Sequence, residues 1–160
     1  MTARAGGPAR ARALAAVALA TVVLAGGGCR TGNAELPAVC KEGARKVAAA
    51  LRAAPGPVRL EGGTRLSRCV HDARSDADLQ TVGTVFTQAA DGLASRVPTN
   101  ESAALELGYL TGAARRGASR TNGTATELVR RVEQAAGLEG PPPDRRAAYE
   151  RGIAAGRRSG

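Results

Sequence analysis

The stretch that decides the fold is "SDADLQTVGTVFTQAADGLASRVP", residues 75–98. Its apolar side chains recur every three or four residues, the spacing that gathers them on one face of an α-helix. Ser75 can cap this helix while Asp78 reaches back, with Asp in the usual place of Glu in a capping box. Pro98 ends the pattern. The apolar face is made of Leu79, Val82, Phe86, Ala89, Ala90, Leu93 and Val97.

The segments before residue 75 show the same helical period. A first helix is predicted over residues 36–54, because the Pro55-Gly56-Pro57 stretch cannot be crossed by an intact helix. Val58 and Leu60 then alternate briefly, Gly62-Gly63 predicts a turn, and a helical stripe resumes over residues 66–73.

The segments after Pro98 predict three further helices. Thr99 or Asn100 starts a helix that runs to about Ala118, and Thr124 with Glu127 forms a capping box for a helix ended by Gly137. Three prolines, residues 141–143, precede a last short helix that starts at Asp144. With no sustained strand alternation, residues 36–160 predict a single all-α, bundle-like domain of four to six helices with one irregular loop.

Two glycine pairs share a short sequence pattern. "GYLTGAARRG" (residues 108–117) and "GIAAGRRSG" (residues 152–160) each carry two glycines four apart, followed by two arginines. This spacing puts Gly108 with Gly112, and Gly152 with Gly156, on one helix face, where another backbone can approach closely. We predict helix packing inside the domain, with a contact between copies of the chain as the alternative.

The N-terminal segment has the pattern of a signal peptide. Arg4, Arg10 and Arg12 form a basic region without acids, and residues 13–25 are uncharged and too short to span a membrane. An amphipathic helix of a cytosolic protein is the alternative, but this run is apolar on every face. We expect residues 1–28 to direct export and residues 29–35 to form a short tether.

Cys29 is a candidate for lipidation. Gly27 and Gly28 match the small residues that precede the cysteine of a bacterial lipobox, although Gly26 stands where Leu is usual. The ordinary leader peptidase could instead cut after the small residues 25–27 and release a soluble protein. Cysteine parity favours lipidation: if Cys29 takes lipid, Cys40 and Cys69 remain, and an oxidising compartment would join them.

Composition narrows the function classes. Without residues 1–28 the chain keeps 132 of its 160 residues, enough for one domain, and its formal charge falls from +9 to +6. Phe86, Tyr109 and Tyr149 are its only aromatic residues, so platforms for bases or sugars are hardly available. Nucleic-acid binding is therefore disfavoured, whereas the basic balance fits an anionic envelope surface or simply a solvated helical surface.

Catalytic and metal motifs are largely missing from the sequence. His71 is the single histidine, which disfavours a zinc site, and no nucleophile elbow or phosphate-binding loop is present. His71 and Asp72 are adjacent, so on a helix they point in different directions and make a poor acid–base pair. Asp72, Asp76 and Asp78 resemble a calcium loop only at first sight, because the glycine and the terminal glutamate of an EF-hand loop are absent, so helix capping explains them better. We expect no enzyme activity, cofactor or metal.

The chain resembles uncharacterised lipoproteins and secreted proteins of high-GC Gram-positive (actinobacterial) bacteria. The resemblance is carried by the leader that ends at Cys29 and by "PGPVRLEGGTRLSRCV", "DADLQTVG", "LGYLTGAARRGA" and "ELVRRVEQ". It implies a location at the cell envelope and a Cys40–Cys69 pairing, and it implies no catalytic residue.

Two functions follow as expectations. The first is a lipid-anchored helical interaction module on the outer face of the cell membrane, which contacts a protein partner or the anionic envelope. The second is a soluble secreted protein that holds a small ligand between its helices. Close packing of the alanine-rich stripes favours the first.

Overall fold

The structure is a computed structural model that describes residues 35–135, 137 and 140–160. The expected signal peptide and the lipidation site at Cys29 lie outside the described residues, as does nearly all of the expected tether. The described part is all-helical, as predicted, with six α-helices and two short 3₁₀ helices and no strand. None of these helices is both long enough and apolar enough to cross a membrane.

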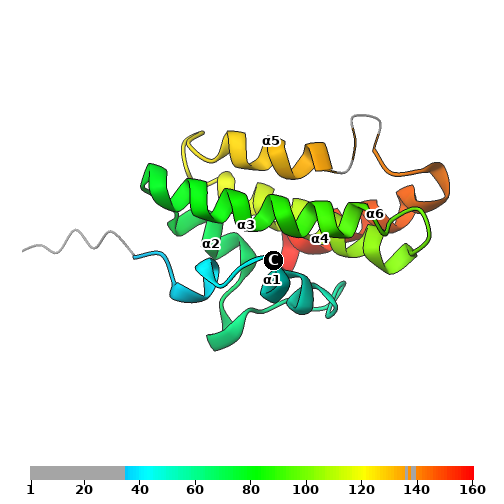
Figure 1. Ribbon diagram of the computed structural model, residues 1–160, viewed down its shortest axis with the longest axis horizontal. Helices are drawn as coiled ribbons and strands as arrows, with labels where there is room; N and C mark the ends of the chain where they lie inside the picture. The colour runs from blue at the N-terminus through cyan, green and yellow to red at the C-terminus, as the bar shows by residue number, and fades with distance from the viewer. Residues whose placement is uncertain (1–34, 136, 138–139) are drawn as a thin grey trace, which may run out of the picture. The chain divides into compact units, whose positions relative to one another are not determined.

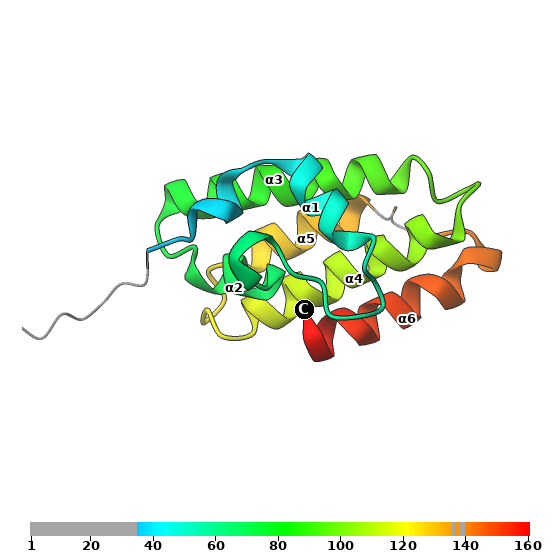
Figure 2. The same cartoon turned by 90° about the horizontal axis from the view of Figure 1, so that it is seen from below.

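Three helices lie side by side in one layer (Figures 1 and 2). They are α3 (Asp76–Ala94), α4 (Glu101–Ala118) and α6 (Pro143–Ser159), with α4 in the middle. The short helices α1 (Ala44–Leu51) and α2 (Leu66–Asp72) cover one face of the layer, and α5 (Thr126–Ala135) covers the other. Because α4 has neighbours on every side, most of its residues are buried.

The helix predicted from residues 75–98 forms as expected. The amide of Asp78 donates to the Ser75 hydroxyl at 3.1 Å, so Ser75 caps α3. The Asp78 carboxylate does not reach the backbone as a longer Glu would; it accepts from the Ser75 hydroxyl at 2.8 Å and lies 3.7 Å from the Lys41 ammonium. Asn100 caps α4 by accepting from the amide of Ala103.

The single helix predicted over residues 36–54 is wrong. The 3₁₀ helix η1 (Ala38–Lys41) and α1 occupy this segment, separated at Gly43. Gly43 has φ of 101°, in the left-handed region that a helix cannot include and that glycine tolerates. Cys40, before the break, and Val47, after it, are both buried in the core. The apolar spacing of the sequence therefore runs on across the break without revealing it.

The capping box predicted at Thr124 and Glu127 is also wrong. The Thr124 hydroxyl donates to the carbonyl of Thr121, one turn before α5 begins at Thr126. The Glu127 carboxylate instead accepts from Arg130 and Arg131, and these hydrogen bonds lower its pKa to about 2. Paired with two following arginines, Glu127 is not bonded to the backbone ahead of the helix.

The last helix is not short, as predicted, but has 17 residues and begins at Pro143. Proline is tolerated in the first turn, where its missing N–H has no intrahelical partner. Gly137 follows α5 with φ of 86°, consistent with its predicted role as a helix terminator.

The contact between α4 and α6 is made by the two glycine pairs. A methyl group added at Gly108 or Gly112 would overlap the carbonyl oxygen of Tyr149 or Ile153 on α6. Reciprocally, a methyl group at Gly152 or Gly156 would overlap backbone atoms of α4. The two helices therefore meet backbone to backbone, an approach that any side chain at these positions would prevent.

A disulfide joins Cys40 of η1 to Cys69 of α2, with the two Cα atoms 5.5 Å apart. Both cysteines are fully buried. The bond closes a loop of 29 residues that contains α1 and the turn η2 (Glu61–Gly63). It therefore fixes α2 against the beginning of the described domain.

Candidate functional site

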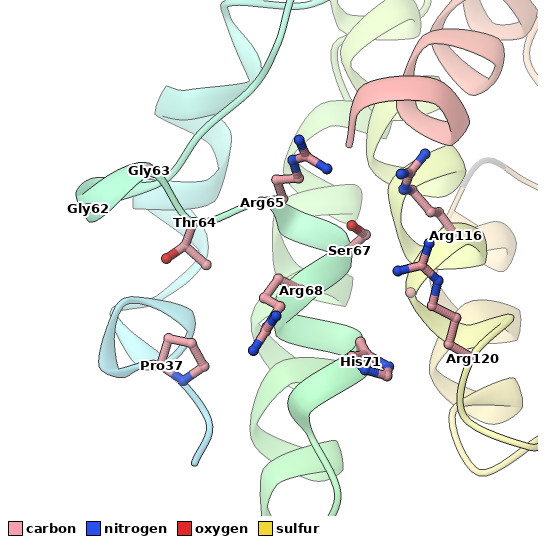
Figure 3. A pocket seen from close by; sticks show the side chains of 11 residues that line it. Pro37, Gly62, Gly63, Thr64, Arg65, Ser67, Arg68, His71, Arg116 and Arg120 are labelled. Carbon is pink, nitrogen blue, oxygen red and sulfur yellow. The ribbon is translucent and has the colours of Figure 1, made fainter. Parts of the chain in front are cut away.

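A basic surface cleft of about 540 Å³ lies between α2 and the C-terminal part of α4. We call it the arginine cleft. Figure 3 shows its two walls, with Arg65 just before α2 and Arg68 on α2, and with Arg116 and Arg120 on the other side; the Arg68 side chain points toward Pro37, away from Arg116 and Arg120. The remaining lining residues are Pro37, Gly62, Gly63, Thr64, Ser67, His71 and Gly117.

The arginines reach the cleft because of their helical spacing. Arg65 directly precedes α2 and lies three residues before Arg68, while Arg116 lies in the last turn of α4 and Arg120 follows two residues beyond its end. Each wall therefore contributes two arginines to the lining, although Arg68 turns to Asp72. The chain thus brings four positive charges together, and no carboxylate is among the described residues that line the cleft.

Close backbone contact sets the distance between the two walls. A methyl group at Gly117 would overlap the carbonyl oxygen of Ser67 and the side chain of Val70 on α2. The Ser67 hydroxyl donates to the carbonyl oxygen of Gly160 at 2.6 Å, which ties α2 to the end of α6. The two walls are therefore held by closely packed contacts in which α2, α4 and the end of α6 take part.

Two of the four arginines are held by the protein. Arg116 donates through Nη1 to the carbonyl oxygens of Arg157 and Arg158, at 2.6 and 2.7 Å, and so caps the last turn of α6. Arg68 is hydrogen-bonded to Asp72, whose side chain is only 2% exposed. Both guanidinium groups are thereby oriented before any ligand arrives.

The other two arginines make no ion pair or side-chain hydrogen bond within the described part of the chain. Arg65 and Arg120 are exposed and stand on opposite walls. An unpaired guanidinium keeps all five donors for a ligand, in a planar fork that fits carboxylate and phosphate oxygens. These two residues are the available binding groups of the arginine cleft.

His71 and Asp72 lie at the cleft but do not act together. His71 lines the cleft, and its Nδ1 atom is buried without a hydrogen-bond partner in the described structure. Asp72 turns to Arg68 instead of the imidazole. Asp72 therefore does not orient the His71 imidazole in the described structure.

A second buried acid lies in the core and does not line the cleft. Glu106 of α4 is 9% exposed, and its carboxylate lies 3.6 Å from the Arg96 guanidinium. Burial raises the pKa of Glu106, while the positive charges of Arg96 and Arg52 act in the opposite direction. Within the described residues, no group of three or more His, Cys, Asp or Glu side chains is arranged to hold a metal ion.

Sequence reasoning identified the basic balance of the chain but not these four arginines. The spacings Arg65 to Arg68 and Arg116 to Arg120 could have shown that each pair shares a face. That the two faces are opposed depends on the α2–α4 contact at Gly117, which no local pattern indicates.

No family model, no curated protein and no solved structure matches this chain. The assignment of a function consequently rests on the arginine cleft and on the sequence.

Proposed function

We propose that this protein is an exported, lipid-anchored interaction module that binds an anionic group at the outer face of the cell membrane. The observation that carries the proposal is the arginine cleft, which four arginines line without a lining carboxylate among the described residues. Such a concave basic surface attracts anions more strongly than the same charges spread over a convex surface.

The sequence of the leader supports the location. The chain carries a basic region, an apolar run and small residues before Cys29, the order found in exported lipoproteins. The disulfide between Cys40 and Cys69 fits an oxidising compartment outside the cytoplasm. Anchoring through Cys29 would keep the domain at an interface that is rich in anionic groups.

The anchor is tested by comparing wild-type protein with Cys29→Ala after cell fractionation. Wild-type protein should partition into detergent and take up a fatty-acid probe, and the variant should do neither. Equal amounts of both forms in the culture medium, with N-termini at or before Gly28, would refute the anchor.

Binding is tested separately with the unlipidated Cys29→Ala chain added to isolated envelope membranes. We expect retention that weakens with salt and is lost when Arg65→Gln and Arg120→Gln are combined. Arg146→Gln is the control, because Arg146 is exposed and lies about 18 Å along α6 from Arg158. Equal retention of the double variant and the control would exclude the cleft as the binding site.

The second candidate is a soluble secreted protein that binds a small anionic ligand. It is favoured by the size of the cleft, since about 540 Å³ is within the range of small-molecule sites. The cleft lies between α2 and α4, as a ligand site between helices would, but it is polar and open at the surface. Release of the wild-type protein into the medium would favour this candidate.

A further inference from the structure

We propose that the arginine cleft binds a ligand with two phosphate groups, one contacted from each wall. This inference rests on the proposed anion-binding function and names its ligand class. The argument uses the charge of the cleft, the orientation of its donors and the chemistry of its lining.

The charge of the cleft calls for more than one anionic group. Four guanidinium groups line it, and Asp72 neutralises only Arg68. A single chloride or carboxylate would leave most of this positive charge uncompensated. Two phosphate groups supply about two negative charges as diesters and about three to four as monoesters, so either form compensates most of the net charge of four arginines and Asp72.

The donors are divided between two walls. Arg65, just before α2, and Arg120, two residues beyond α4, are without side-chain partners in the described structure, and they lie on opposite sides of the cleft (Figure 3). Arg116, fixed by the carbonyl groups of α6, adds an oriented guanidinium next to Arg120. Guanidinium forks bind phosphate oxygens in pairs, so each wall can hold one phosphate.

The lining disfavours ligands that carry a nucleobase or that bind through an acyl chain. No aromatic ring other than the His71 imidazole lines the cleft, which leaves little for stacking a nucleobase. Apolar side chains are almost absent, so acyl chains find no surface to cover. The volume of about 540 Å³ leaves room for a short hydrophilic linker between two phosphates.

Two sources of such a ligand share this chemistry. One is a soluble diphosphate or bisphosphate ester, and the other is the headgroup of a diphosphatidyl lipid, in which glycerol joins two phosphates. Pro37 lies on the rim of the cleft and only eight residues after Cys29. An extended chain of that length reaches at most about 29 Å, so a lipid on Cys29 would keep the cleft within reach of headgroups.

The soluble source is tested by calorimetric titration of the unlipidated Cys29→Ala chain at constant ionic strength. The ligands are pyrophosphate, inorganic phosphate and citrate, the last being a multivalent anion without phosphate. The lipid source is tested by sedimentation with phosphatidylcholine vesicles that contain cardiolipin, phosphatidylglycerol or oleate at equal surface charge.

Support is binding of pyrophosphate or cardiolipin at least tenfold tighter than binding of the matched citrate or oleate probe. Preference for pyrophosphate alone assigns the soluble source, and preference for cardiolipin alone assigns the headgroup. Combining Arg65→Gln with Arg120→Gln should weaken the preferred interaction at least 100-fold, and Arg146→Gln should change it less than twofold. Replacing the same two arginines by lysine should give an intermediate loss, because lysine keeps the charge but not the planar fork.

The proposal is overturned if citrate and oleate bind as tightly as the phosphate probes, or if the double variant binds like wild type. It is also overturned if none of the probes binds. Under any of these outcomes, envelope membranes can still retain the protein in a way that weakens with salt and depends on Arg65 and Arg120. That result would support the anion-binding function and would refute only the assignment of a phosphate ligand. The exposed positions of Arg65 and Arg120 predict unchanged melting temperatures for the variants, which separates lost binding from lost folding.

Discussion

The substitution Gly112→Ala tests the contact between α4 and α6 with the smallest side chain that can be added. The new methyl group would overlap the carbonyl oxygen of Ile153 and approach the backbone nitrogen of Arg157 to 3.0 Å. Both are backbone atoms of a helix and cannot rotate away as the end of a side chain could. The substitution must therefore push α6 away from α4.

The cost is the difference between two opposing effects. Overpacking a buried contact costs about 1–3 kcal/mol, and collision with rigid backbone places Gly112→Ala near 3 kcal/mol. Replacing Gly by Ala inside a helix returns about 1 kcal/mol. We therefore expect the free energy of unfolding to fall by about 2 kcal/mol, which lowers the melting temperature of a domain of this size by about 6–10 °C.

The measurement is thermal and urea unfolding of the unlipidated Cys29→Ala chain, followed by far-ultraviolet circular dichroism. Gly92→Ala on α3 is the matched control, because no atom lies within 4 Å of a methyl group added there. The control should gain about 0.5–1 kcal/mol from helix propensity alone. A Gly112→Ala variant that melts at or above the wild-type temperature would show that the two backbones are not in contact.

Three other perturbations have defined outcomes. Replacing Cys40 and Cys69 by serine should lower the free energy of unfolding by about 3–4 kcal/mol, because the unfolded chain would no longer be closed into a loop of 29 residues. Mass spectrometry that found both thiols free in exported protein would contradict the disulfide. Because the folded state raises the pKa of Glu106, the free energy of unfolding should fall as the pH rises through that pKa. Glu106→Gln should remove this pH dependence and melt at a higher temperature than wild type at pH 7. A variant with the same pH profile of stability as wild type would contradict the role of Glu106. Asn100→Ala should lower the free energy of unfolding by about 1 kcal/mol, because it removes the cap of α4. Thr124→Ala should lower it little, because Thr124 does not cap α5. Equal losses of stability for the two variants in urea unfolding would contradict these cap assignments.

Local signals predicted most of the helices because each signal acts within a few residues. Ser75 and Asn100 cap the helices that follow them, and the apolar period between Leu79 and Leu93 predicts the buried face of α3. The break at Gly43 was missed because the apolar spacing continues across it. A positive φ leaves no trace in the periodicity of neighbouring side chains.

The length of α6 was underestimated for a different reason. Its buried face consists of Ala148, Gly152, Ala155 and Gly156, which pack through backbone atoms and methyl groups. Large apolar side chains are what a hydrophobic period detects, so a helix that packs through glycine gives a weak signal. The glycine spacing indicated a close helix contact, but it did not indicate that the two pairs would meet each other.

The arginine cleft depends on contacts between residues that are far apart in the sequence, and none of these contacts involves the guanidinium group of Arg65 or Arg120. The disulfide at Cys69 fixes α2 beside Pro37, and Gly117 lets α4 approach the backbone of α2. Without these contacts Arg65 and Arg120 would be two exposed cations among the 23 Lys and Arg residues of a chain with formal charge +9. Net charge accounts for a general attraction to anions, whereas selectivity for one anion requires donors at fixed separation. The α2–α4 junction supplies that separation, so a methyl group at Gly117 should weaken selective binding while leaving the charge of the cleft unchanged.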